Sequence, residues 1–274
     1  MRLVTFESGG RVGVGVRSDG RILDTGYGSM LDLIADGDAG LEKADAASAE
    51  VALERLLAPI PRPPKLLCSG VNYASHADEN PDAVMPTEPF FFSKLPSAVI
   101  GPGEPIVIPG PETLTDYEVE LAMVIGRTAK GLPEGSALDA VFGWTILHDV
   151  SARDVQFKDN QITLGKGVDT FSPLGPEIVT ADELGDWSTL HVSSRLNGNK
   201  MQDSPTSEML FTPGRLLEFL TRLVTLVPGD IVTTGTPAGV GCFRDPPVYL
   251  QPGDKVAVAV DRIGELTNPV VAGW

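Results

Sequence analysis

The chain has 274 residues, 42% hydrophobic and 21% charged, which is enough for one large domain or one domain with a small appendage. The formal net charge of −16 argues against a nucleic-acid partner, whose phosphates require a basic surface, and it does not favour an anionic membrane. No apolar run approaches the roughly 20 residues that span a bilayer, and the start lacks a secretory signal, so we expect a cytoplasmic protein.

The first sixty or so residues combine short strands with helical segments. Tight turns separate the expected strands, and apolar spacing predicts the helices. The strands are expected at 3–6, 12–16 and 22–24, and the helices at 30–35 and 49–57. Repeated prolines at 59–64 restrict the backbone and indicate an extended linker. We therefore expect a small N-terminal α/β domain at 1–62 and a second domain at 63–274.

Beyond the linker, short apolar segments alternate with glycine and proline. These segments predict strands, and a single clear helix is expected at 213–224. The strands are expected near 65–70, 98–101, 105–109, 121–125, 141–148, 190–196, 230–234 and 255–260. Strands and helices do not alternate regularly. The pattern therefore predicts an α+β fold that is mainly β.

Acidic residues stand at alternate positions of the segment 116–125. Asp116, Glu118 and Glu120 would share one face of a strand, because side chains alternate across it. Ionised carboxylates entering a core must be paired or bound to a metal, and oxygen ligands favour magnesium, manganese or calcium. The alternative is a half-exposed strand with a solvated acidic face.

Asp149 follows the apolar segment 142–147, at the point where a buried strand is expected to end. Functional groups gather where rigid strands give way to loops, so Asp149 is a candidate third metal ligand. The alternative is that it caps a short helix at 151–154, which is a common use of aspartate.

His76 and Glu79 lie three residues apart in a segment that fits one helical turn. On a helix they would face the same side, and the carboxylate could orient the imidazole and raise its basicity. Such a pair can activate water. The alternative is an ordinary surface pair.

Two glycine-rich segments are candidates for ligand contact. Lys166 lies between Gly165 and Gly167, where a small ligand could approach the backbone and the ammonium could hold a developing enolate. The segment 228–241, a strand ending in a loop rich in glycine and threonine, offers hydroxyl and amide groups to a carboxylate. Either segment could equally be a plain turn.

The sequence contains two cysteines, Cys68 and Cys242, far apart in the chain. They match no metal or redox spacing, so we expect two ordinary reduced thiols without a chemical role.

Taken together and in order, these motifs resemble those of the fumarylacetoacetate hydrolase family. The similarity runs from about residue 65 to the C-terminus. It rests on 70–73 with His76 and Glu79, and on 86–94, 116–121, 149–154, 165–171, 197–198 and 235–241. The first sixty residues resemble, more weakly, a small accessory domain of bacterial members.

The resemblance implies a mixed, folded β roll, a homodimer, and a role for each matching residue. It implies a Mg²⁺ or Mn²⁺ ion and a 2-oxo acid substrate. The metal ligands would be Glu118, Glu120 and Asp149. The catalytic residues would be His76, Glu79 and Lys166. The substrate-binding residues would be Arg153, Gln156 and Thr236.

The resemblance further implies a hydrolase that cleaves a C–C bond of a 2,4-dioxo acid, such as an acylpyruvate, through a metal-stabilised enolate. His76, oriented by Glu79, would deprotonate the attacking water. Aromatic or sugar-acid catabolism is the expected setting. The alternatives are an isomerase of 2-hydroxyhepta-2,4-diene-1,7-dioate, a decarboxylase of oxaloacetate or 5-oxopent-3-ene-1,2,5-tricarboxylate, and a binding protein for small dicarboxylates.

Overall fold

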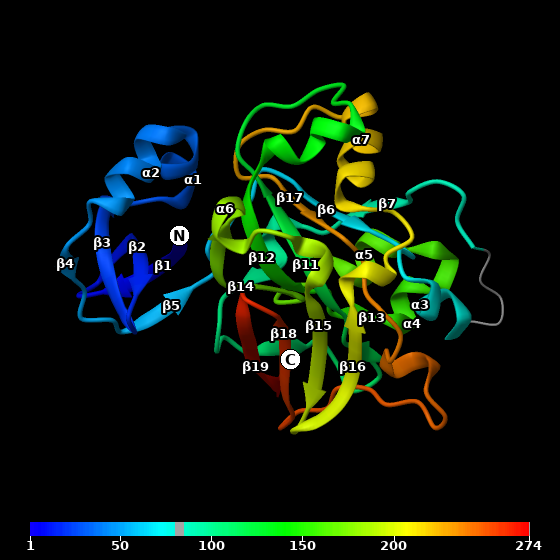
Figure 1. The fold of residues 1–274 in the computed structure, drawn as a ribbon. Coiled ribbons are helices and arrows are strands. Elements are labelled where there is room, and N and C mark those ends of the chain that lie inside the picture. Colours follow the sequence, from blue (N-terminus) through cyan, green and yellow to red (C-terminus); the bar gives the residue numbers. More distant parts are fainter. Residues whose placement is uncertain (80–84, 274) are drawn as a thin grey trace.

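A long mixed sheet runs through the molecule (Figure 1). The structure is a computed structural model that describes residues 1–79 and 85–273. The main path of the sheet is β4-β3-β2-β1-β14-β12-β11-β17-β6-β7, with β5 paired to β1 and β8 paired to β14. Its strands are β1 (Arg2–Ser8), β2 (Arg11–Ser18), β3 (Arg21–Tyr27), β4 (Ala49–Glu50), β5 (Arg55–Leu57), β6 (Leu66–Ser69), β7 (Phe91–Ser93), β8 (Val99–Ile100), β11 (Val119–Ile125), β12 (Val141–His148), β14 (Ser172–Thr180) and β17 (Ile231–Thr233).

A second sheet of five strands has the order β16-β15-β18-β19-β9, and two short strands pair separately. The second sheet consists of β9 (Ile106–Ile108), β15 (His191–Leu196), β16 (Asn199–Pro205), β18 (Lys255–Val260) and β19 (Gly264–Ala272), and the separate pair is β10 (Thr115–Asp116) with β13 (Ser151–Ala152). Most pairs are antiparallel, whereas β6 with β17, β8 with β14 and β9 with β19 are parallel. The predicted fold class, α+β and mainly β with mixed sheets, is confirmed.

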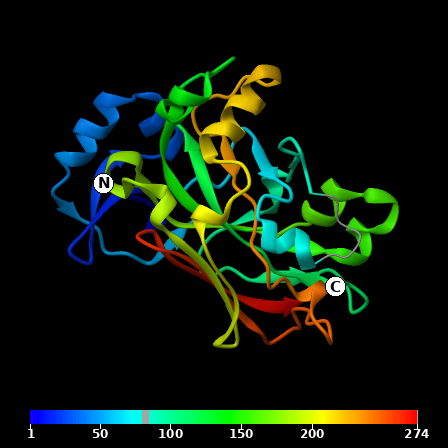
Figure 2. The same ribbon diagram turned by 45° about the vertical axis from the view of Figure 1, so that its right-hand side comes forward.

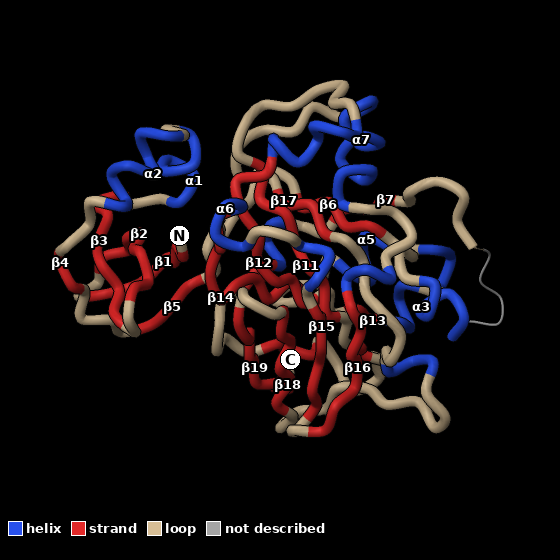
Figure 3. The backbone as a smooth tube through the Cα atoms, in the orientation of Figure 1, coloured by secondary structure: helices blue, strands red, loops and turns tan. Residues whose placement is uncertain are grey.

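The helices are short and lie mostly around the strands (Figure 3). They are α1 (Met30–Ala35), α2 (Asp38–Asp45), α3 (Ala74–Glu79), α4 (Arg153–Gln156), α5 (Ile162–Lys166), α6 (Ala181–Leu184) and α7 (Pro213–Leu223), with 3₁₀ helices η1 (Pro96–Ala98), η2 (Glu134–Ala140), η3 (Lys158–Asn160), η4 (Trp187–Thr189), η5 (Thr206–Glu208) and η6 (Gly241–Phe243). The helix expected at 213–224 is confirmed as α7, which begins with a Thr212 cap and a proline in its first turn. Over the described ranges, no helix is both long and apolar enough to cross a membrane.

The N-terminal part lies at one end of the molecule (Figure 2) but shares its sheet. β1 pairs with β14 in an antiparallel arrangement, and Leu3 lies opposite Ile178. The strands expected in the first 24 residues and the helix at 30–35 are confirmed. The helix expected at 49–57 is wrong, because β4 pairs with β3 and β5 pairs with β1, so that strand pairing overrides helical spacing. The predicted division at 62/63 falls between β5 and β6 and stays a prediction.

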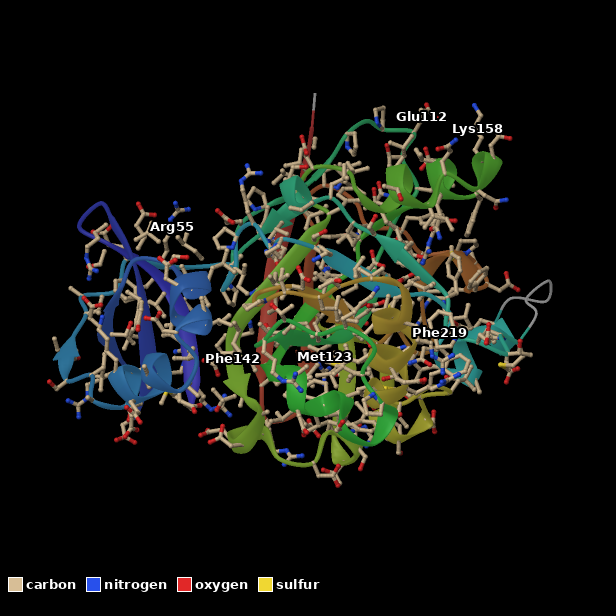
Figure 4. The ribbon with its side chains drawn as sticks, turned by 90° about the horizontal axis from the view of Figure 1, so that it is seen from above. Arg55, Glu112, Met123, Phe142, Lys158 and Phe219 are labelled. Carbon is tan, nitrogen blue, oxygen red and sulfur yellow. The ribbon has the colours of Figure 1, made fainter. Side chains whose placement is uncertain are left out.

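β11 is buried along its whole length and separates two hydrophobic clusters. Leu121 and Met123 belong to one cluster, and Ala122 and Val124 belong to the other. Figure 4 shows Met123 inside the central body of the protein. Glu120 shares a face with Ala122, since side chains alternate along the strand. Glu120 thus lies at one end of β11, on the same face as the buried apolar residues Ala122 and Val124.

Candidate active site

A cavity of about 200 Å³ lies where β6, β11 and α3 to α5 meet. Most of the residues singled out from the sequence line it, together with aromatic rings. The lining includes His76, Glu118, Glu120, Arg153, Gln156, Lys166 and Thr236, with Phe90, Phe92, Phe157 and Phe243. The other two predicted residues, Glu79 and Asp149, contact lining residues from outside this set. The fold therefore gathers residues that are far apart in the chain, as the contact between Glu79 and Gly239, 160 positions apart, illustrates.

Strand pairing brings Asp149 beside the acidic end of β11. Glu120 is opposite Leu147 on β12, and the Asp149 amide donates to the Glu118 carbonyl at 2.9 Å. The helix-cap alternative for Asp149 is wrong, because α4 begins after Ala152 and has no side-chain cap. The Asp149 carboxylate is instead buried among cations.

Lys166 lies between two of the carboxylates. Its ammonium is 2.9 Å from Glu118 and 2.7 Å from Asp149, and it sits over the Phe92 ring. Burial alone would lower the pKa of Lys166, but Asp149 and Glu118 hold that pKa above its usual range. Lys166 is therefore a fixed positive charge at the cavity wall.

Arg153 is the second cation of the cavity. Its guanidinium is 2.6 Å from Glu118 and 2.8 Å from Asp116. Burial would raise the pKa of Glu118, but Lys166 and Arg153 outweigh it and hold that pKa well below the usual range. Glu118 is therefore ionised, and both of its oxygens are bound by cations.

Lys94 is a third buried cation, which the sequence analysis included in a motif without assigning it a role. Its ammonium donates to the Asp149 carboxylate and, at 3.0 Å, to the Val150 carbonyl. Burial lowers the pKa of Lys94, and the contact with Asp149 opposes this effect. Asp149 is thus held between Lys94 and Lys166.

Asp116 shares the face of Glu118 and Glu120, as expected, but it anchors a loop. Its carboxylate accepts from the amides of Gly241 at 2.7 Å and Cys242 at 3.1 Å, and from Arg153 Nε at 2.9 Å. A buried carboxylate with this many donors is fully satisfied. Asp116 therefore ties the 235–243 segment to the cation that lines the cavity.

Glu120 is the unpaired member of this group. In the described parts of the chain its carboxylate forms no ion pair, and Oε2 has no hydrogen-bond partner. Burial raises the pKa of Glu120 well above its usual range, and Asp149 and Glu118 raise it further. A buried ionised carboxylate needs a compensating positive charge.

A divalent cation fits this arrangement. Four carboxylates lie against three cations, and the unmatched one is Glu120. One donor atom each from Glu120, Asp149 and Cys68 lie within 4.8 Å of one another. Carboxylate oxygens suit Mg²⁺ and Mn²⁺. Glu118 borders the same cavity and is a further candidate ligand. Both oxygens of Glu118 and both oxygens of Asp149 contact buried cations, so the ligand roles of Glu118, Glu120 and Asp149 stay predictions.

His76 and Glu79 form the expected pair on α3. His76 Nδ1 is 3.0 Å from Glu79 Oε2, and Glu79 Oε1 accepts from the Gly239 amide at 2.6 Å. The carboxylate is thereby fixed from two sides, and it fixes the ring of His76, which lines the cavity. The i, i+3 contact is confirmed.

Gln156 and Thr236, the predicted substrate contacts, both line the cavity. Gln156 Oε1 accepts from Arg153 at 2.8 Å, and the Thr236 hydroxyl accepts from Gln202 at 2.8 Å. Gln202, which the sequence analysis did not single out, also donates to the Pro237 carbonyl and so holds the loop in place.

Comparison with known proteins identifies what this chain is similar to. Residues 65–271 match the family described as fumarylacetoacetate (FAA) hydrolase C-terminal. The oxaloacetate tautomerase fahd2, mitochondrial, of Xenopus laevis is 43% identical over 99% of this chain and 90% of that protein.

Solved structures also match along the whole chain. Fumarylacetoacetate hydrolase from psychrophilic Exiguobacterium antarcticum is 39% identical, with a TM-score of 0.88 over 99% of both chains. Maleylpyruvate hydrolase from Sphingobium sp. SYK-6, in complex with manganese (II) ion and pyruvate, is 31% identical, with a TM-score of 0.84 over 100% of both chains.

Proposed function

Because this chain belongs to the fumarylacetoacetate hydrolase family, we propose that it is a divalent-cation-dependent enzyme of small 2-oxo acids. The observation that carries the proposal is the composition of one cavity. It joins a buried carboxylate that has no ion-pair partner among the described residues, two cations and a histidine oriented by a glutamate. These groups can bind an acid anion and move a proton at the same place.

We assign the cation to Glu120 and Asp149, with Glu118 as a further carboxylate. The relative solved with manganese and pyruvate supports the presence of a divalent cation, and the unsatisfied oxygen of Glu120 supports its place. When bound, Mg²⁺ or Mn²⁺ would polarise the keto group of a 2-oxo acid and favour its enolate.

The side chains of the chain itself would divide the remaining work. Lys166 and Arg153 would hold the negative charge of the substrate, because both are buried cations that line the cavity. His76 would give or take the proton at the carbon beside the keto group, and Glu79 would keep its ring oriented. Gln156 and Thr236 would position the acid.

The reaction we favour is the interconversion of the enol and keto forms of oxaloacetate. The enol hydroxyl loses a proton and the adjacent carbon gains one, so atoms and charge balance without water. The full-length similarity to an oxaloacetate tautomerase supports this choice. The reaction needs a proton-transfer group and positive charge at the enolate, which His76, Lys166, Arg153 and the proposed divalent cation would supply together.

Hydrolysis of a 2,4-dioxo acid is the second candidate. The His76–Glu79 pair supports it, since an oriented imidazole can deprotonate water, and the maleylpyruvate hydrolase relative supports it also. Decarboxylation of oxaloacetate, a further alternative, would be recognised by a separate measurement of the pyruvate formed. Homodimer formation, a cytoplasmic location and a role in aromatic catabolism remain predictions.

The test compares two substrates and three variants. Loss of the oxaloacetate enol and cleavage of an acylpyruvate are followed by ultraviolet absorbance, with Mg²⁺ or Mn²⁺ and then with EDTA. We expect enol loss to be accelerated, EDTA to abolish the effect, and His76→Gln and Glu79→Gln to lower kcat/KM by about 10²–10⁴-fold.

The control is His191→Gln, because His191 is an exposed histidine on β15. It should match the wild type. Activity that survives thorough chelation would refute the dependence on a cation. Rapid acylpyruvate cleavage without acceleration of enol loss would instead favour the second candidate.

A further inference from the structure

Cys68 lies against the candidate cation position rather than in a purely apolar setting. It is a residue of β6 and is 0% exposed. Its sulfur, a Glu120 oxygen and an Asp149 oxygen are mutually within 4.8 Å. Metal–sulfur and metal–oxygen bonds are about 2.0–2.3 Å long, so movements of a few tenths of an ångström or more in these side chains would bring all three atoms onto one metal ion.

Strand order explains why residues distant in sequence meet here. β6 pairs with β17, β17 with β11, and β11 with β12, with Ala122 opposite Thr233 and Glu120 opposite Leu147. One hydrophobic cluster contains the side chains of Cys68, Ala122 and Leu147, so these side chains lie on the same face of the sheet. Cys68 therefore stands on the face that carries Glu120.

An independent observation indicates a ligand at this position. Glu120 is 1% exposed, and its Oε2 has no hydrogen-bond partner among the described residues. The unsatisfied oxygen belongs to the same carboxylate that lies beside the sulfur. A cation held by both groups would satisfy it.

We propose that Cys68 is a soft donor in the cation site, which therefore takes thiophilic divalent cations such as Co²⁺, Zn²⁺ and Cd²⁺ with a metal–sulfur bond. The inference rests on the proposed cation site at Glu120 and Asp149. As the metal–sulfur bond forms, the S–H bond breaks and the proton passes to the solvent buffer; no group is oxidised or reduced.

The charges around the site fit this additional anion. Lys94 and Lys166 both contact Asp149, so the three anionic donors, the divalent cation and the two ammonium groups together carry one positive charge. Thiolate favours soft and borderline cations, whereas Mg²⁺ prefers oxygen. Cys68 thus changes which cation binds most tightly.

The test uses the full chain stripped with EDTA and titrated with Co²⁺ or with Mg²⁺ alone. We expect Co²⁺ to produce a sulfur-to-cobalt charge-transfer absorption in the near ultraviolet. Cys68→Ser and Cys68→Ala should remove this absorption and weaken Co²⁺ binding by about tenfold or more, with Mg²⁺ binding unchanged within about twofold.

Cys242→Ser is the matched control, because it removes the other cysteine of the chain. It should keep the absorption. An absent absorption in the wild type, or one that persists in Cys68→Ser, would overturn the proposal. If the Cys68 variants do not fold, the spectrum of Cys242→Ser decides, because Cys68 is then the one remaining cysteine of the chain. Since the readout is binding, the result is independent of which substrate the enzyme uses.

Discussion

The positive charge of Lys166 offsets the electrostatic repulsion between the carboxylates of Glu118 and Asp149. Its ammonium touches both Glu118 and Asp149 while facing the cavity. We predict that Lys166→Met lowers kcat/KM by about 10²–10³-fold, because a preorganised positive charge at the reacting anion is lost. Divalent-cation binding, measured by calorimetry, should persist or tighten, since two carboxylates lose a competing cation.

Lys158→Met is the control for this change. Lys158 is exposed on η3, at the periphery of the molecule in Figure 4. It should retain full activity. An activity of Lys166→Met within about threefold of the wild type would contradict a role for its charge at the reacting anion.

His148 gives the protein a predicted sensitivity to acid. It is buried on β12, and burial and Lys94 lower its pKa from 6.5 to about 3. As the pH falls below 6.5, His148 becomes protonated in the unfolded chain, whereas in the folded chain it stays neutral until about pH 3. The stability is therefore complete above pH 6.5 and falls as the pH drops, by up to about 1.4 kcal/mol per pH unit.

Urea unfolding between pH 7 and pH 4 measures this slope. We predict that His148→Gln flattens the slope relative to the wild type, because glutamine does not titrate. His191→Gln, at an exposed position, serves as the control. Equal slopes in wild type and His148→Gln would contradict the prediction.

The predicted residues were found in the sequence because their motifs are local, as with His76 and Glu79 on one helical turn. Lys94 and Cys68 could not be given roles from the sequence, because their contacts depend on strand order. We expected from the sequence that Cys68 has no chemical role. Its position beside Glu120 and Asp149 is a reason to test that expectation. Asp116 was recognised as a member of the acidic strand face, but its role in holding the 235–243 segment could not be, because the Gly241 amide that it accepts from is 125 positions away in the chain.

At the scale of elements, the 235–243 segment depends on the absence of a side chain at Gly241. A Cβ there would lie 1.8 Å from the Val248 carbonyl oxygen and 2.6 Å from Asp116 Oδ1. We predict that Gly241→Ala costs about 1–3 kcal/mol of unfolding free energy by urea denaturation, because the loop must move. It should also lower kcat/KM, since the Gly239 amide that holds Glu79 would shift.

Gly110→Ala provides the comparison, because a Cβ at Gly110 meets nothing within 4 Å. It should leave both stability and activity close to wild type. If Gly241→Ala and Gly110→Ala had the same unfolding free energy and the same kcat/KM, the close contact between Gly241 and the Val248 carbonyl would not be important for the loop.

Strands with regular spacing and the capped helix α7 could be predicted from the sequence because local pattern and final structure agree there. The 49–57 segment could not, because its conformation is set by pairing with β1 and β3. Short edge strands carry little pattern of their own, and distant partners decide their structure.

At the scale of the whole molecule, the N-terminal part and the remainder share one hydrophobic cluster. Leu3, Val14 and Leu33 pack in the same cluster as Leu147 and Ile231. Arg2 and Arg17 also form ion pairs with the buried carboxylate of Glu177 on β14. Composition indicated two units in sequence, but a shared core is a property of tertiary packing that no local pattern reveals.

The three buried cations of the candidate active site are enclosed in a chain of net charge −16. A dianionic substrate, as proposed, would therefore be repelled during its approach and attracted only after it enters, where the proposed divalent cation adds to these three charges. Because salt screens exposed charges over about 8 Å at 0.15 M but affects buried ones less, kcat/KM for oxaloacetate should rise with added potassium chloride. The value of kcat at saturation should change little. At low substrate concentration the enzyme would thus be faster at high ionic strength than at low ionic strength. Proteins that attract their ligands by long-range electrostatic steering show the opposite dependence on salt.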